Sequence, residues 1–375
     1  MSRIAIVSLS ISPGDAVGND ALEMHRILSA RGHTVGLFNS HWIKKTSCTR
    51  DMAELPAFLD DDAEAILLYH HAVGWSAGLS LLRQPTGKRV VKYHNVTPGR
   101  FFAGFPGDQQ RVCQMGREHL CELAQADCDL YLSDSPYNQD ELLDAGASAE
   151  RCAVVPPFHH IDRLDSVKAD PGVLRCLGDG QTNLLFVGRR APNKGHRFLI
   201  DAFAAYHEHY NGDSRLVLVG KEDRHLIDYS NRLREQASRL GVLDCVVFID
   251  GVTESELKGY YETASVFVVA SEHEGFCVPV VEAMALKVPI VAYGTSAVPH
   301  TVGDAGLLWE EPDPFLLAQS IDTVVRDAGV RRQLTERGWR RYQNLFCNQR
   351  IEHAFLQAMR PLLTEPARQR VGIPA

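Results

Sequence analysis

The sequence predicts an α/β protein of two Rossmann-like domains, each a doubly wound parallel sheet, facing each other across a cleft. The chain has 375 residues, which is long for a single hydrophobic core. Short apolar runs alternate with longer amphipathic segments, as in parallel sheets covered by helices on both faces. The alternation stops near residue 156 and restarts after residue 180, so two such units are expected.

Six short apolar runs predict the strands of the first domain. These runs are 4–9, 34–38, 65–69, 89–93, 129–132 and 152–155. Between them, residues 20–31 have helical apolar spacing, with Asn19 expected to cap the start and Gly32 to end the helix. Residues 136–145 repeat this plan after Ser135.

A polar stretch flanked by Pro156-Pro157 and Asp170-Pro171-Gly172 predicts a linker. Six further strands are expected after it, at 183–187, 215–219, 245–249, 266–270, 289–293 and 306–309. Helices are predicted at 314–328, 330–342 and 350–363. We therefore expect an N-terminal domain of residues 1–170 and a C-terminal domain of residues 171–344, with a final helical region, about 345–375, packing back on the first domain.

Composition narrows the class of protein. The net charge of −8 argues against a general nucleic-acid binder. Nine scattered cysteines without a CxxC pair indicate a reduced, cytoplasmic chain. The spacing of Cys113, Cys121 and Cys128 favours packing along a helix over a metal site. The apolar run 4–11 is too short to span a membrane, and it predicts a first strand.

The segment Ser271 to Ala285, SEHEGFCVPVVEAMA, carries the clearest functional signal. It places Glu274 and Glu282 eight positions apart across a predicted junction between a strand and a helix. Pro279 suits the first helical position. The free amides of Phe276, Cys277 and Val278 would then lie at a helix start, which attracts phosphate. Two carboxylates beside that start can accept hydrogen bonds from sugar hydroxyls, so the segment predicts a sugar-nucleotide site.

A second loop supplies cations for the same ligand. A predicted strand runs into Gly188 and Arg189, and Lys194 follows five residues after the arginine. Glycine at a strand end lets the backbone approach a ligand closely, and two cations on one loop can bind the two phosphates of a nucleoside diphosphate. They would also stabilise that diphosphate as it leaves.

These two segments together resemble a known family. Phe186-Val187-Gly188-Arg189 through Lys194-Gly195, followed by Ser271 to Ala285, is similar to the retaining glycosyltransferases of family 4, which have GT-B architecture. The resemblance implies that Arg189 and Lys194 hold the diphosphate, that Glu274 contacts the donor sugar and that Glu282 contacts the ribose. It also implies donor contacts from Gly188, Gly275 and the backbone of residues 276–278.

In the first half, His94 follows a predicted strand, as the active-site histidine of that family does. The resemblance implies that it touches the donor sugar near the reacting carbon. The first loop of the family is often glycine-rich, but here Asp15-Ala16-Val17-Gly18 keeps one glycine of that pattern. Gly18 remains a candidate for donor binding.

The resemblance implies a retaining, metal-independent hexosyltransferase. It would move a hexose from a nucleoside diphosphate sugar to a saccharide or lipid-linked saccharide acceptor, in polysaccharide or glycolipid biosynthesis. The sequence predicts no cofactor and no metal ligand set, so the sugar nucleotide is a co-substrate. Phe101, Phe102 and Phe105 either guide an acceptor or pack under a loop. Together with Trp42, Lys44 and Lys45, these residues introduce a further option, which is peripheral contact of the protein with the inner face of the membrane.

Competing functions stay open on the sequence. Gly74-Trp75-Ser76-Ala77-Gly78 matches the GxSxG nucleophile elbow and predicts an α/β serine hydrolase with Ser76 as nucleophile. Asp60 to Asp62 resembles the acidic triplet of metal-dependent transferases, although it precedes a strand, which favours a solvated loop. A sugar-nucleotide sensor or an epimerase with the same two-domain plan is a third alternative.

Overall fold

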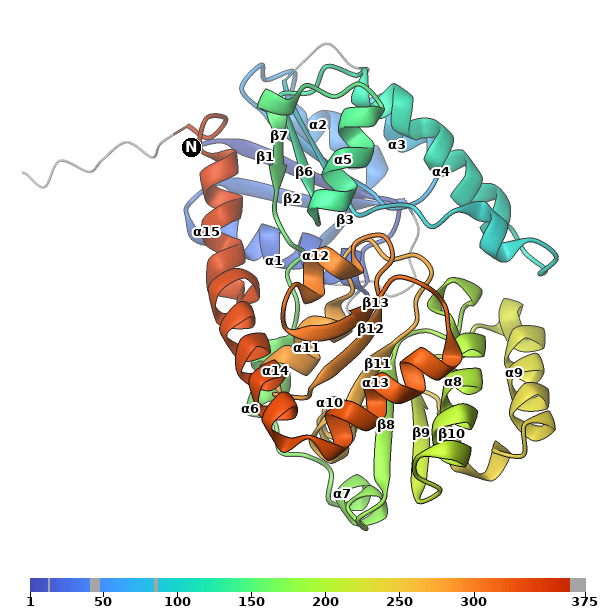
Figure 1. The fold of residues 1–375 in the computed structure, drawn as a ribbon. Coiled ribbons are helices and arrows are strands. Elements are labelled where there is room, and N and C mark those ends of the chain that lie inside the picture. Colours follow the sequence, from blue (N-terminus) through green and yellow to red (C-terminus); the bar gives the residue numbers. More distant parts are fainter. Residues whose placement is uncertain (13, 41–47, 84–86, 365–375) are drawn as a thin grey trace, which may run out of the picture.

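Two parallel sheets form the frame of the molecule (Figure 1). The structure is a computed structural model and describes residues 1–12, 14–40, 48–83 and 87–364. The first sheet has seven strands in the order β3-β2-β1-β4-β5-β6-β7, and the second has six in the order β10-β9-β8-β11-β12-β13. All pairings between neighbouring strands are parallel. The predicted fold class is confirmed.

The strands of the first sheet lie close to their predicted positions. They are β1 (Arg3–Ser8), β2 (Thr34–Asn39), β3 (Thr49–Asp51), β4 (Ile66–His71), β5 (Lys88–Tyr93), β6 (Leu130–Ser133) and β7 (Cys152–Val154). The edge strand β3 was not predicted, because three residues with two charges give no apolar run.

Helices cover both faces of the first sheet. The helices of this half are α1 (Ala16–Ala30), α2 (Leu55–Leu59), α3 (Ser76–Leu81), α4 (Gln109–Ala124) and α5 (Pro136–Asp144), with the short turns η1 (Met52–Glu54), η2 (Gly99–Phe102) and η3 (Ala149–Arg151). The predicted start of α1 was wrong. Its cap is Asp15, whose carboxylate accepts from the Gly18 amide at 2.9 Å, and Asn19 lies inside the helix.

The second sheet follows the same plan. Its strands are β8 (Thr182–Val187), β9 (Ser214–Val219), β10 (Val246–Ile249), β11 (Val266–Val269), β12 (Ile290–Tyr293) and β13 (Gly306–Trp309). Its helices are α6 (Ile161–Ser166), α7 (Pro171–Leu177), α8 (His196–His209), α9 (Ile227–Arg239), α10 (Glu254–Thr263), α11 (Val278–Ala285), α12 (Val298–Val302), α13 (Pro314–Arg326) and α14 (Ala328–Arg341), with the turns η4 (Pro192–Lys194), η5 (Arg224–Leu226) and η6 (Leu243–Cys245). Residues of α8, α9 and α13 pack on one face, and residues of α6, α7, α10 and α11 pack on the other.

The stretch expected as a linker contains the helix α6. Its Ile161 and Leu164 are buried in the core of the second sheet, whereas Val155 and Phe158 belong to the core of the first. The expectation of a purely polar connection was therefore wrong, because the two apolar residues of α6 are too few to show a helical period in the sequence.

The chain crosses between the halves a second time near its end. A π-helical turn, η7 (Tyr342–Phe346), packs in the second core, and α15 (Asn348–Met359) places Ile351, Phe355 and Met359 against the first sheet. Figure 1 shows α15 running along the first sheet towards the N-terminus. The crossings are bonded to each other, since His159 Nε2 lies 2.7 Å from the Phe346 carbonyl oxygen and Asn348 Nδ2 donates to the His159 carbonyl at 2.9 Å.

Candidate functional site

The carboxyl ends of β8 and β11 lie side by side at the point where the strand order of the second sheet reverses. β8 pairs with β11 on one side and with β9 on the other. Ligands of doubly wound sheets bind at this switch point. Gly188, Arg189 and Lys194 follow β8, and Ser271 to Glu274 follow β11, so the topology brings the two predicted segments together.

Lys194 and Glu274 are in direct contact. Lys194 Nζ lies 2.8 Å from both carboxylate oxygens of Glu274. Ser271 Oγ donates to Glu274 Oε1 at 2.7 Å, and the Glu274 amide donates to Ser296 Oγ at 2.8 Å. The Lys194 side chain keeps 24% of its surface exposed, against 9% for Glu274. From the sequence, Lys194 was expected to bind the diphosphate and Glu274 to contact the sugar. An ion pair between the two residues was not predicted.

Arg189 pairs with Asp223, which follows β9. Its Nη1 lies 3.4 Å from Asp223 Oδ2, and its side chain is 48% exposed. Its neighbour Arg190 is buried and faces Glu222 and Asp250 at 3.5 and 3.7 Å. The Arg189 guanidinium is therefore accessible to a ligand, whereas the Arg190 guanidinium is buried and paired with acidic residues of the protein.

Gly188 and Gly195 allow the close packing of this edge. A Cβ atom on Gly195, which has φ +67°, would lie 1.9 Å from the Ala270 carbonyl oxygen. A Cβ on Gly188 would lie 2.9 Å from the Phe186 ring. The loop that carries Lys194 is thereby pressed against the end of β11.

The start of α11 offers unpaired backbone donors. Phe276, Cys277 and Val278 donate no amide hydrogen bond to another residue in the described part of the chain. Cys277 has φ +75°, in the left-handed region that costs a side chain about 1–3 kcal/mol, and such strain concentrates at ligand sites. The helix begins at Val278, one residue earlier than predicted, and Pro279 is its second residue. This helix start can bind an anion.

Glu282 lies on α11 and is bound from within the protein. The Tyr261 hydroxyl donates to Glu282 Oε2 at 2.6 Å. Burial raises the pKa of Glu282, and the Tyr261 hydrogen bond offsets part of that rise. Its Oε1 accepts no hydrogen bond from any described residue, so one oxygen can accept from a hydroxyl of a ligand.

The first half contributes a buried charged cluster behind His94. His94 Nδ1 lies 2.9 Å from Asp134 Oδ2, and His94 Nε2 lies 2.8 Å from His70 Nδ1. Lys92 Nζ lies 2.6 Å from Asp134 Oδ1 and 4.0 Å from Asp20 Oδ2. We define these five residues, Asp20, His70, Lys92, His94 and Asp134, as the buried cluster. The His94 side chain is 4% exposed, so its imidazole is engaged inside the first half.

The pKa values of the two acids in this cluster are shifted in opposite directions. Burial raises the pKa of Asp20, with Lys92 and His94 offsetting part of the rise. Burial would also raise the pKa of Asp134, but His94 and Lys92 hold it below its usual value. Asp20, His70 and His94 place one ligand atom each within 4.8 Å of one another. However, 2.8 Å between the imidazole nitrogens is a hydrogen bond, and Lys92 already supplies the positive charge.

Sequence reasoning missed this cluster apart from His94. Two signals were present: Lys92 lies among the apolar residues Val90, Val91 and Tyr93 at the end of β5, and Asp134 comes directly after β6, at the same sheet edge as His94. A lysine within a buried strand requires a partner, and the nearest carboxylates at that edge were the candidates.

The two halves meet at Gly275. A Cβ on Gly275 would lie 2.6 Å from the His94 carbonyl oxygen and 2.7 Å from Asn95 Cβ. Beside it, His273 Nε2 lies 2.7 Å from Asn95 Oδ1 across the interface. The absence of a side chain at Gly275 therefore lets the strand end of the first half pack against the residue next to Glu274.

Gly18 and Ser76 are differently placed. The Gly18 amide is bonded to Asp15, and a Cβ there would lie 2.0 Å from the Ser12 carbonyl oxygen, which gives this glycine a packing role. Ser76 begins α3, but its Oγ contacts Met115 Sδ at 3.7 Å, and among the described residues no histidine is hydrogen-bonded to it.

Asp60 and Asp61 are in a loop at the opposite strand ends, with φ of 53° and 48°. Trp42, Lys44 and Lys45 lie outside the described residues.

Comparison with known proteins agrees with this geometry. Residues 177–341 match the family Glycosyl transferases group 1. Over these residues the chain is similar to that family. The match covers β8 to β13 and so includes Arg189, Lys194, Glu274 and Glu282. The resemblance seen in the sequence is confirmed for this glycosyl transferase domain.

Curated relatives align with part of the chain. The D-inositol 3-phosphate glycosyltransferase of Acidothermus cellulolyticus is 33% identical over 201 residues, which are 50% of this chain and 43% of that protein. The mannosylfructose-phosphate synthase of Agrobacterium fabrum is 33% identical over 170 residues, 44% of this chain and 37% of that protein. The chain thus spans about half the length of the curated relatives that it matches.

Solved structures extend the likeness to both halves. Sucrose-phosphate synthase from Thermosynechococcus elongatus has a TM-score of 0.75 at 21% identity, covering 96% of this chain and 99% of that one. Anabaena Alr3699/HepE, solved in complex with UDP, has a TM-score of 0.74 at 18% identity, covering 96% and 100%. The fold is therefore the GT-B arrangement. Among the described residues, no helix combines the length and the apolar character needed to cross a bilayer.

Proposed function

We propose that this protein is a retaining, metal-independent hexosyltransferase. It moves a hexose from a nucleoside diphosphate sugar to a saccharide or lipid-linked saccharide acceptor, in polysaccharide or glycolipid biosynthesis. The observation that carries the proposal is the contact between Lys194 and Glu274 beside the unpaired amides of residues 276–278. A cation and an anion-binding helix start suit the diphosphate, and the carboxylate suits the sugar.

In the proposed complex each group of the donor meets one part of this site. Arg189 and Lys194 bind the diphosphate together with the start of α11. Glu274 accepts from hydroxyls of the transferred sugar once the phosphate has drawn Lys194 away, and Glu282 Oε1 accepts from the ribose. Because Anabaena HepE was solved with UDP and with UDP-glucose, uridine nucleotides are the first donors to test.

The transfer step needs positioning and electrostatics more than a strong base. The bond from the anomeric carbon to the phosphate oxygen breaks, and the acceptor oxygen bonds to that carbon on the same face. The acceptor proton passes to the departing phosphate oxygen. Lys194, Arg189 and the amides stabilise the charge that develops there, which in comparable sites is worth about 2.7–4 kcal/mol for one donor. These side chains take the place of a divalent cation, so no metal is included in the proposal.

In this proposal His94 mainly positions the backbone next to Glu274 and does not itself react. The buried cluster fixes the imidazole, and the His94 backbone meets Gly275 next to Glu274. A direct contact between the imidazole and the donor sugar would require His94 to leave His70 on binding. Replacing His70 by phenylalanine frees His94 Nε2, and a change in donor KM in that variant would reveal such a contact.

A thermal-shift screen across UDP-, GDP- and ADP-hexoses tests the donor. A ligand that binds the folded state raises the melting temperature. The matched variants are Lys194→Ala and Lys88→Ala, because Lys88 forms an exposed ion pair with Glu64 at 2.8 Å, far from the site. We expect the shift to shrink in the first variant and to persist in the second. If no nucleotide sugar shifts the melting temperature, the proposal is wrong.

Product analysis tests the reaction. Nuclear magnetic resonance of the glycoside should show the anomeric configuration of the donor, and EDTA should leave the rate unchanged. Interconversion of the donor sugar without an acceptor would identify an epimerase instead. Inactivation by a fluorophosphonate that labels Ser76 would identify a hydrolase. Pelleting with anionic liposomes, with and without the acceptor, tests membrane contact.

A further inference from the structure

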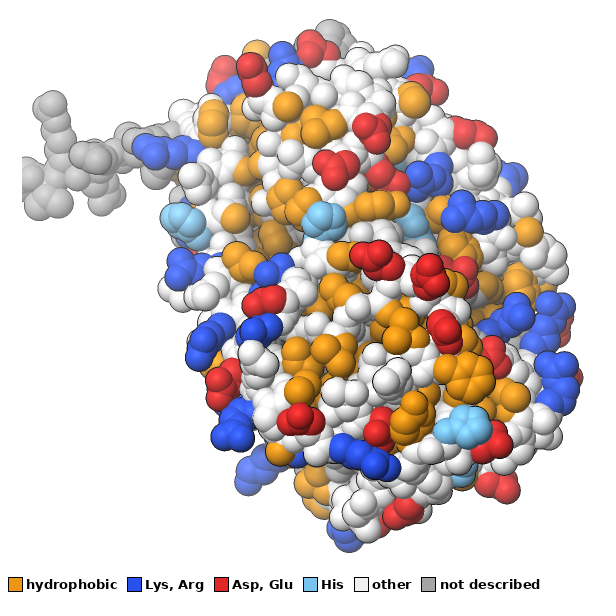
Figure 2. Space-filling view, viewed as in Figure 1, with side chains coloured by type: hydrophobic (Ala, Val, Ile, Leu, Met, Phe, Trp, Pro, Cys, Tyr) orange, Lys and Arg blue, Asp and Glu red, His pale blue; other side chains and the backbone are white. Residues whose placement is uncertain are grey.

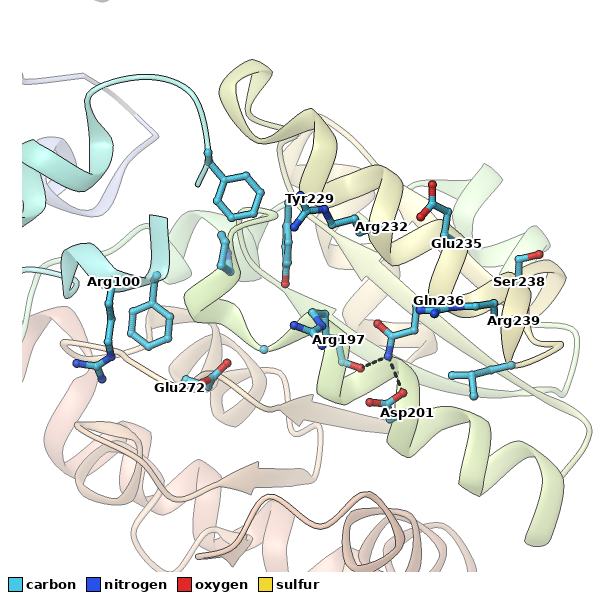
Figure 3. Close-up of a pocket in the computed structure, with 15 residues that line it drawn as sticks. Arg100, Arg197, Asp201, Tyr229, Arg232, Glu235, Gln236, Ser238, Arg239 and Glu272 are labelled. Carbon is cyan, nitrogen blue, oxygen red and sulfur yellow. Dashed lines mark hydrogen bonds between the residues drawn. The ribbon is translucent and has the colours of Figure 1, made fainter. Parts of the chain in front are cut away.

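A large pocket opens next to the proposed donor site, between the two halves. It has a volume of about 1200 Å³ and is walled by η2 and the loop after it on one side and by α8 and α9 on the other (Figure 3). Gly195, which directly follows Lys194, and Glu272, which is two residues from Glu274, both line it. A molecule in this pocket therefore lies beside the Lys194–Glu274 pair.

Aromatic rings form part of its wall. Phe101 and Phe105 line the pocket and also pack against the hydrophobic core, whereas Phe102 is buried in that core. The rings of Phe105 and Tyr229 meet edge to face with centroids 6.1 Å apart. Their apolar faces suit the ring of a sugar better than an extended charged chain.

The pocket also holds arginines without acidic partners. Arg100, Arg197, Arg232 and Arg239 line it, and none of them lies within 4.0 Å of a carboxylate of another described residue. By contrast, Arg215 pairs with Asp179 at 2.6 Å and Arg326 with Asp322 at 2.9 Å in the same half. Arginines left unpaired around one hollow favour an anionic ligand.

Two of these guanidinium groups are held over the aromatic rings. The Arg100 guanidinium carbon lies 5.0 Å from the Phe101 centroid, and that of Arg232 lies 5.5 Å from the Phe105 centroid. Figure 3 shows Arg197 from α8 and Arg232 from α9 on either side of Tyr229. Such placement brings a positive charge and an apolar face to the same spot.

Nearby acids do not cancel this charge. Three carboxylates also line the wall, those of Asp201, Glu235 and Glu272, so the four arginines exceed them by one positive charge. The whole chain carries a net charge of −8, so a positive pocket is a local departure. On the face shown in Figure 2, basic side chains gather at the edge formed by α9.

We propose that this pocket binds an anionic saccharide, whose carboxylate or phosphate groups contact Arg197 and Arg232 while its rings lie against Phe101, Phe105 and Tyr229. The proposal rests on the proposed function in one respect, that this saccharide is the acceptor. The pocket is larger than the 300–1,000 Å³ usual for small ligands, which suits more than one sugar residue.

The test is retention on an array of matched neutral, carboxylated and phosphorylated oligosaccharides. Wild type should bind acidic members at least tenfold more tightly than neutral ones of the same backbone. Arg197→Gln combined with Arg232→Gln should reduce this binding at least tenfold. A control with the same charge change, Arg175→Gln with Arg360→Gln on other exposed surfaces, should bind as wild type does.

Several results would overturn the proposal. They are preference for neutral members, no retained oligosaccharide, acidic binding that survives the double substitution, and binding to anionic vesicles without any binding to soluble acidic saccharides. Within the acidic set, the carboxylated and phosphorylated arms identify which anion the arginines bind.

Donor binding separates this proposal from the proposed function. The Kd for the nucleotide sugar should be unchanged in the double variant, whereas the KM for the acidic acceptor should rise at least tenfold. A weaker donor in that variant would assign the pocket to the donor and overturn the inference. If no nucleotide sugar binds but acidic saccharides are retained through Arg197 and Arg232, the proposed function fails and the binding site stands.

Discussion

Each half of the molecule sets a lysine against a carboxylate at the same kind of strand end, but the two pairs differ in access to water. Lys92 and Asp134 lie 2.6 Å apart with side chains 0% and 6% exposed. Lys194 and Glu274 lie 2.8 Å apart, and the lysine is 24% exposed. A pair without access to water cannot exchange its partner for a ligand, whereas the open pair can. If the proposed function holds, exposure, more than residue type, separates the structural ion pair from the pair that binds the donor.

The largest effect should come from breaking the closed pair. Lys92→Met leaves Asp134 without its cation in the interior, which costs about 3–5 kcal/mol of unfolding free energy. Urea denaturation measures the loss. Lys88→Met, in an exposed pair, should cost less than about 1 kcal/mol. Equal losses in the two variants would mean that burial does not distinguish them.

The same substitution in the open pair should act on turnover. Lys194→Met should slow transfer about 10²- to 10³-fold, because a charge that stabilises the leaving phosphate is removed. Its unfolding free energy should fall by about 1 kcal/mol, since Ser271 still donates to Glu274 and water reaches the site. Steady-state kinetics and urea denaturation on one preparation give both numbers. A larger stability loss than in Lys92→Met would reverse the comparison.

The buried histidines of both halves predict that the stability of the protein depends on pH. Burial lowers the pKa of His196 to about 3 and that of His71 to about 4, from an ordinary 6.5. The unfolded chain therefore binds more protons below pH 6.5, and stability falls as the pH falls, by up to about 1.4 kcal/mol per unit for each group. His196→Phe keeps an aromatic ring beside Phe186 and should flatten part of this slope between pH 6.5 and 4.

Urea denaturation at several pH values measures that slope. The slope left in His196→Phe belongs to the other buried histidines, among them His70 and His71 in the first half. If the variant keeps the whole wild-type slope, the acid sensitivity lies outside α8.

The smallest effect should come from the surface where the halves meet. Gly275→Ala places a Cβ about where the His94 carbonyl oxygen approaches, at 2.6 Å, so the halves must separate slightly. We expect a three- to tenfold loss of kcat/KM, within the range of about 1.4 kcal/mol per factor of ten, and little change in melting temperature. Gly212→Ala, where a Cβ would lie 3.8 Å from the His207 carbonyl oxygen, is the control. A variant with full activity would show that this contact does not position the site.

Most of the fold could be predicted from the sequence because buried parallel strands are continuous apolar runs. Twelve of the expected runs became strands. The misses have local causes: β3 is short and charged, Asp15 rather than Asn19 caps α1, and α6 has two buried apolar residues in a polar stretch. Such features depend on partners distant in the chain, which a local pattern does not record.

The candidate site was predicted in its second half and less well in its first. Lys194, Glu274 and Glu282 lie on two segments whose glycine and proline positions fix the backbone locally. The buried cluster joins Asp20, Lys92 and Asp134 from three separate elements, and their contact follows from the strand order β1-β4-β5-β6. The arginine pocket combines residues from both halves, so no single segment of the sequence could reveal it.

The two crossings of the chain near His159 and Phe346 have a mechanical consequence. The two crossings are hydrogen-bonded to each other, so they form one connection between the halves. Any movement of one half relative to the other has to bend the chain at this connection. Such a movement would also change the close approach of Gly275 to the His94 carbonyl oxygen.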